Sequence, residues 1–134
     1  MYEVEEAFPG VQCITTLWWT RDVREELMKF LLSKGKNEQR FAEKLKYYAQ
    51  SGFRNYEGKV GAAIRHEGSQ VYRISDGGLY RIAGFYEGDT TQNFIAISSF
   101  LKKKEKNSAK ERDIYAKVVE VKKSSLYLKV GLNP

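Results

Sequence analysis

The feature that most constrains the fold is a group of three short β-type runs in the middle of the chain, separated by only a few residues each. Apolar, β-branched and aromatic residues gather at 71–74, 79–86 and 94–97, and such residues favour the pleated, half-buried surface of a strand. Residues 76–78 (DGG) and 87–89 (EGD) lie between the runs and tolerate the positive φ angles of hairpin turns. The runs therefore predict three consecutive antiparallel strands.

A further strand and two helices are predicted before this group. The run 11–19 (VQCITTLWW) indicates a strand, in which Trp18 and Trp19 should point to opposite faces. Apolar residues recur every three or four positions from 23 to 31, which predicts a helix. Thr20 can cap the start of this helix, which should end near Gly35. A second helix should begin near Asn37 and end at Ser51-Gly52, with its apolar stripe at Phe41, Leu45 and Tyr48.

The last part of the chain predicts one more helix and a short terminal strand or tail. Residues 52–69 show no periodicity and read as an irregular connection. Ser108 and Glu111 have the spacing of a capping box that would open a helix with an apolar stripe at Ile114, Val118 and Val121. Alternating apolar residues from 126 to 132 indicate a short terminal strand or an apolar tail.

The order of these elements indicates the α+β class. We expect a mainly antiparallel sheet of about four strands, with helices packed against one face and the other face free to bind a partner. The length of 134 residues fits a single domain over 1–134. Residues 124–134 would form the additional strand or tail.

Charge and cysteine content narrow the class of protein. Lys and Arg number 23 against 17 Asp and Glu, which gives a formal net charge of +6 and favours an anionic partner such as nucleic acid, membrane headgroups or an acidic protein. The single cysteine, Cys13, forms no internal disulfide and is expected to be a small buried side chain. The acidic start of the chain is unlike a signal peptide, and no apolar stretch approaches the length of a membrane span. These features favour a cytoplasmic protein.

Basic and aromatic side chains are interleaved between Tyr72 and Tyr115. Such a mixture suits RNA, because cations bind phosphates and rings stack on unpaired bases. The alternative is that the lysine run after Phe100 is only a solvated connection. The basic residues are Arg73, Arg81, Lys102, Lys103, Lys104, Lys106, Lys110 and Arg112.

This half of the chain resembles the RelE/ParE toxin superfamily, most closely the phage-derived HigB-like branch. The resemblance covers residues 71–116 and depends on three segments in order: YRI at 72–74, GGLYRI at 77–82 and FIAISSFLKK at 94–103, with Lys106 before a helix. Over 11–52 it extends only to the order of elements, a strand followed by two helices.

The resemblance implies a toxin of a type II toxin-antitoxin system that cleaves messenger RNA on the ribosome. In this mRNA interferase reaction, which needs no metal or other cofactor, the 2′-hydroxyl attacks the adjacent phosphate. Arg81 corresponds to an arginine that stabilises the transition state in RelE-type endoribonucleases, and Arg73 projects from the neighbouring strand. Lys102 and Lys103 would hold the scissile phosphate and the backbone. Tyr115 is the ring available for proton transfer, although a core role is the alternative for it.

Further contacts follow from the same resemblance. Tyr80 would stack on a base, while Lys104, Lys106, Lys110 and Arg112 would bind RNA. The implied partners are mRNA, the ribosome and a cognate antitoxin, which would form a hetero-oligomer with the toxin, and no role for a membrane is implied. The only histidine, His66, lies in the irregular connection and reads more readily as a surface residue than as a proton carrier. Its distance from Cys13 in the sequence argues against a structural zinc site.

Two alternatives remain open at this point. A ParE-like toxin has the same fold but inhibits DNA gyrase by binding and cleaves nothing. A degenerate phage-derived protein would keep the fold as a binding module without activity. Clustered cations on one surface favour the endoribonuclease, because phosphate chemistry requires them.

Overall fold

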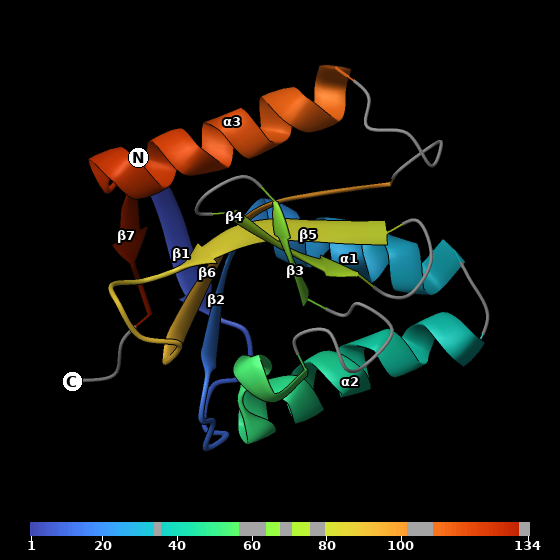
Figure 1. Ribbon diagram of the computed structural model, residues 1–134. Coiled ribbons are helices and arrows are strands. Elements are labelled where there is room, and N and C mark those ends of the chain that lie inside the picture. Colours follow the sequence, from blue (N-terminus) through green and yellow to red (C-terminus); the bar gives the residue numbers. More distant parts are fainter. Residues whose placement is uncertain (34–35, 57–63, 68–70, 76–79, 102–108, 132–134) are drawn as a thin grey trace.

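A computed structural model describes residues 1–33, 36–56, 64–67, 71–75, 80–101 and 109–131. Among these residues, three α-helices and one 3-10 helix accompany a seven-stranded mixed sheet (Figure 1). The chain is therefore α+β, as the sequence predicts. The strands are β1 (Tyr2–Glu6), β2 (Thr16–Thr20), β3 (Ile64–Glu67), β4 (Val71–Ser75), β5 (Tyr80–Tyr86), β6 (Asn93–Leu101) and β7 (Tyr127–Lys129). The helices are α1 (Arg21–Ser33), α2 (Lys36–Ser51), η1 (Phe53–Tyr56) and α3 (Ala109–Ser124).

The three predicted strands of the middle segment are confirmed as β4, β5 and β6. Each pairs antiparallel with the next, and β3 extends the group at its outer edge. A register shift between Ala83 and Gly84 interrupts the pairing of β5 with β6. At Gly84 an added Cβ would lie 2.1 Å from the carbonyl oxygen of Ile95. The close approach of these two strands therefore requires glycine at position 84.

The other half of the sheet was not predicted in full. The sheet order is β3-β4-β5-β6-β2-β1-β7, with β2 parallel to β6 and β7 parallel to β1. The expectation of about four mainly antiparallel strands is therefore too simple. The first predicted strand begins at Thr16 and not at residue 11. The strand β1 was missed because its sequence YEVEE is largely charged, and only Val4 is buried.

Helices cover both faces of the sheet, which corrects the expectation of one covered and one free face. Figure 1 shows α3 above the sheet and α2 below it. On β5 and β6 apolar side chains point both ways, since Ile82 belongs to one buried cluster while Ala83 and Phe85 belong to the other. Both faces therefore need an apolar cover.

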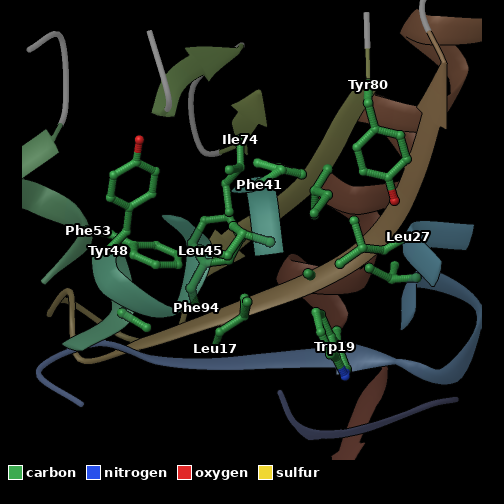
Figure 2. Close-up of a cluster of buried hydrophobic side chains, with 14 of the residues drawn as sticks. Leu17, Trp19, Leu27, Phe41, Leu45, Tyr48, Phe53, Ile74, Tyr80 and Phe94 are labelled. Carbon is green, nitrogen blue, oxygen red and sulfur yellow. The ribbon is translucent and has the colours of Figure 1, made fainter. Parts of the chain in front are cut away.

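The larger core lies between the sheet and the helices α1 and α2 (Figure 2). Leu27 of α1, Leu45 of α2 and Phe94 of β6 are among its fully buried side chains. The smaller core lies under α3, where Tyr115, Val118 and Val121 pack against the strands. Trp19 belongs to the larger core and Trp18 to the smaller one, which confirms that the two indoles point to opposite faces.

Two predicted helix boundaries are confirmed by local geometry. The backbone N–H of Val23 donates a hydrogen bond to Thr20 Oγ1 at 3.1 Å, so Thr20 caps α1. The helix α2 ends at Ser51, and Gly52 follows with a φ of +96°, a conformation that glycine adopts most readily at a helix end. The predicted end at Gly35 lies outside the described residues.

The predicted terminal strand is β7, and it closes the smaller core from the side. The rings of Tyr127 and Phe85 are 5.5 Å apart, although β6, β2 and β1 stand between their strands in the sheet order. The sheet therefore curls around the α3 side. Glu87, just after β5, accepts hydrogen bonds from the Tyr127 hydroxyl and from Lys129 Nζ, the latter at 2.7 Å. These bonds join β7 to the end of β5.

Candidate functional site

The two arginines that the sequence selects lie on the same face of neighbouring strands. Ser75 of β4 is directly opposite Arg81 of β5, and Arg73 precedes Ser75 by two residues. Since alternate residues of a strand point to one face, Arg73 and Arg81 are diagonal neighbours on that face. This is the face covered by α3, because Val71 of the same alternation belongs to the smaller core.

Neutral groups on β4 and β5 orient Arg81. Its guanidinium NH1 donates hydrogen bonds to Ser75 Oγ and, at 3.3 Å, to the carbonyl oxygen of Tyr80. Phe100 of β6 stands directly opposite Arg81 across the β5–β6 pair. Arg81 is half-buried, so it lies at the border between the packed sheet face and solvent.

The helix α3 brings a carboxylate onto Arg73. Arg73 NH1 lies 3.5 Å from Glu111 Oε1, and the two side chains are only 11% and 3% exposed. The Tyr115 hydroxyl donates a hydrogen bond of 2.7 Å to the same carboxylate oxygen, and its ring packs edge-on against Phe100 at 6.0 Å. We call this group the arginine cluster: Arg73, Ser75, Arg81, Phe100, Glu111 and Tyr115.

The arginine cluster carries two guanidinium groups and one carboxylate. Glu111 lies against Arg73 in a contact in which both side chains are largely buried, and removing one partner of such a pair is strongly destabilising. Arg73 and Arg81 are both partly buried, and Glu111 contacts Arg73 directly. Arg73 and Glu111 join α3 to the sheet face beside Arg81.

Tyr80 does not lie where an RNA contact needs it, which corrects that prediction. Its side chain is 2% exposed and belongs to the larger core (Figure 2). Alternation along β5 places it on the face opposite Arg81. The ring stacks on Phe30 of α1 at 4.6 Å and meets the edge of Phe41 of α2 at 5.9 Å. A ring packed between two helices is not available to stack on a base.

The remaining predicted site residues divide into two groups. Lys110 and Arg112 are exposed on the first turn of α3. Lys102, Lys103, Lys104 and Lys106 lie outside the described residues. The described residue that precedes them, Leu101, pairs with Tyr80 at the start of β5, one position from Arg81.

The structure also places the backbone of His66 and the side chain of Cys13. His66 belongs to β3, where its backbone pairs with Tyr72 of β4. Cys13 packs against the larger core, and burial raises the pKa of its thiol, as expected for a structural cysteine. Among the described residues, no three His, Cys, Asp or Glu side chains lie close enough to hold a metal ion.

Sequence reasoning missed the role of Glu111. Its spacing from Ser108 suggests a capping residue, but the structure directs its carboxylate to Arg73. One signal was present: Glu111, Tyr115 and Val118 follow a spacing of four and three residues, which places them on one helix face. An acidic residue in line with an apolar stripe indicates a buried ion pair when the opposing strand carries an arginine.

Comparisons with family models, with curated proteins and with solved structures each found no match to this chain. In the described part of the chain, no helix has the length and apolar character needed to cross a membrane.

Proposed function

We propose that this protein is the toxin of a type II toxin-antitoxin system, a cytoplasmic endoribonuclease of the RelE/HigB kind that cleaves mRNA on the ribosome. The observation that supports it most is the placement of Arg73 and Arg81 as diagonal neighbours on one sheet face. The strand β6 ends at Leu101, which pairs with Tyr80 next to Arg81. Two neighbouring guanidinium groups on one sheet face suit a phosphate.

Arg81 has the central role in the proposed reaction. When the 2′-hydroxyl attacks the adjacent phosphate, negative charge gathers on the phosphoryl oxygens, and a guanidinium held in place beforehand stabilises that charge. Ser75 Oγ and the Tyr80 carbonyl hold NH1 of Arg81 in position. Loss of one such donor typically costs about 3 kcal/mol, or a rate decrease of about 100-fold.

Arg73 and Tyr115 act through the protein framework in this proposal. Both contact Glu111, and together they fix α3 next to Arg81. Arg73 is thus a positioning residue. Tyr115 is 9% exposed, and its hydroxyl donates a hydrogen bond to Glu111. Tyr115 is therefore a positioning residue as well.

A ParE-like toxin that binds gyrase is the second candidate, and one observation favours it. Arg73 already contacts the carboxylate of Glu111, whereas a phosphate site built on both arginines would need both guanidinium groups. Gyrase binding does not require such cations.

The test is an in vitro translation reaction with a defined mRNA, in which primer extension maps any cut. The wild type should cut the mRNA only when ribosomes translate it. Arg81→Ala should cut about 100-fold more slowly. Arg21→Ala, which removes an exposed arginine at the start of α1, is the matched control and should cut normally.

Two results would exclude the endoribonuclease. Intact mRNA together with inhibited gyrase supercoiling would identify the ParE-like alternative. Intact mRNA with active gyrase, and normal growth of cells that express the protein, would identify an inactive binding module. The antitoxin would be sought as a protein that copurifies with the chain and suppresses its toxicity.

A further inference from the structure

An exposed tyrosine near the end of α2 packs against a half-buried tyrosine of η1. Tyr47 is 59% exposed, and its ring meets the edge of Tyr56 of η1 at 5.8 Å. Tyr56 in turn packs on Tyr48 at 4.4 Å, and Tyr48 is a core residue with 4% of its surface exposed (Figure 2). Three rings therefore connect the core to the surface and hold the outermost one in a fixed orientation.

Basic side chains accompany this pair. Arg40 and Lys44 are exposed and precede Tyr47 by seven and three residues, so they share its side of the helix. Arg54 is exposed in η1, two residues before Tyr56. In the described side chains of α2, residues 40–51, Glu43 is the single carboxylate. Glu43 precedes Tyr47 by four residues and shares its side of the helix, so two cations accompany one carboxylate there among the described side chains.

We infer that Arg40, Lys44, Tyr47, Arg54 and Tyr56, here called the α2 platform, bind single-stranded RNA. The inference rests on the proposed function for the choice of RNA over other polyanions. An unpaired base stacks on a tyrosine ring whatever its identity, and neighbouring cations bind the phosphates. A protein partner could also bury the ring of Tyr47, so the choice of RNA depends on the proposed function and is tested directly below.

The α2 platform and the arginine cluster lie on opposite sides of the sheet. Figure 1 shows α2 on one side and α3 on the other, and the arginine cluster lies under α3. RNA on the platform is therefore a different segment from the one cleaved at Arg81. The platform would hold an unpaired stretch of structural RNA while the other side acts on the message.

The test measures fluorescence anisotropy of a labelled oligouridine of about 12 nucleotides, a length that spans one binding site of this kind. Tyr47→Ala should weaken binding about tenfold, while Tyr47→Phe, which keeps the ring, should bind like the wild type. Arg54→Ala should lower the slope of log K against log salt by about 0.7. Met28→Ala, which truncates a residue 53% exposed on α1, is the control and should bind normally.

Equal binding by the wild type and Tyr47→Ala would overturn the platform, as would an equal loss in Met28→Ala. Unchanged RNA binding together with loss of an acidic protein partner would assign the surface to protein recognition and overturn the RNA assignment. Arg81→Ala separates the two proposals, because it should bind the oligouridine normally and fail to cleave mRNA. If the wild type does not cleave but its RNA binding depends on Tyr47, the proposed function fails and the platform stands.

Discussion

Arg73 of β4 and Glu111 of α3 form an ion pair of 3.5 Å between side chains that are 11% and 3% exposed. This pair joins the helix to the sheet face that carries Arg81. The contact between Arg73 and Glu111 therefore also fixes the position of α3 relative to Arg81.

Glu111→Gln should destabilise the fold by about 3 kcal/mol, because it leaves the buried guanidinium of Arg73 without its carboxylate. Chemical denaturation measures this change. The control is Glu5→Gln, which breaks the more exposed pair with Arg24 and should cost less than about 1 kcal/mol. Equal effects of the two substitutions would contradict a buried role for Glu111.

Tyr80→Ala should lower the free energy of unfolding by about 4 kcal/mol, because it empties a core position between α1 and α2. Tyr47→Ala, which removes the same side chain from an exposed site, should change it by less than about 1 kcal/mol. Thermal unfolding of both variants measures the difference. A stable Tyr80→Ala protein with weakened RNA binding would restore Tyr80 as an RNA contact.

Gly84→Ala should destabilise the protein by about 3 kcal/mol or more, because the new methyl group meets the Ile95 carbonyl oxygen at 2.1 Å. Gly88→Ala is the comparison. It has open space around it but a φ of +70°, so its cost should be only about 1 kcal/mol. A larger loss at position 88 than at position 84, measured by urea denaturation, would contradict the close approach of β5 and β6.

The free energy of unfolding should decrease at acidic pH, because Glu87 becomes protonated there. Burial alone would raise the pKa of this carboxyl, but hydrogen bonds from Lys129 and Tyr127 and the charge of Lys129 hold it below its ordinary value. A lowered folded-state pKa gives stability that is fully present above the ordinary value of about 4.3 and is lost as the pH falls below it.

Urea titrations at a series of pH values measure this dependence. In Glu87→Gln the loss of stability below pH of about 4 should be smaller than in the wild type, and stability at neutral pH should be lower by about 2 kcal/mol. The control is Asp89→Asn, an exposed acid in the same turn. An identical pH profile for Glu87→Gln and the wild type would show that the bonds to β7 contribute nothing.

Local patterns were sufficient for the elements that local residues determine. The strands β4 to β6, the cap at Thr20 and the end of α2 at Gly52 all follow from short-range features. The strand β1 could not be predicted in this way, because it depends on pairing with β2 and with the distant β7. Only tertiary contact reveals such a strand.

The candidate site was predictable only in part. Alternation along β4 and β5 places Arg73 and Arg81 on one face, and the structure agrees. The line of Glu111 with the apolar stripe of α3 indicates a buried ion pair, but the stripe does not specify which face of the sheet α3 covers, so the sequence does not identify Arg73 as the partner. Tyr80 was assigned to RNA because a tyrosine beside an arginine suits stacking, whereas strand alternation directs it to the opposite, buried face.

The most direct measurement of the central claim uses the 2′-hydroxyl at the cleavage site. Once the cut is mapped on a translated mRNA, a second mRNA with one 2′-deoxynucleotide at that position is offered to the same ribosomes and protein. We predict that the first mRNA yields a fragment ending in a 2′,3′-cyclic phosphate and that the second stays intact. Equal cleavage of both would contradict attack by the 2′-hydroxyl, and with it the reaction assigned to Arg81.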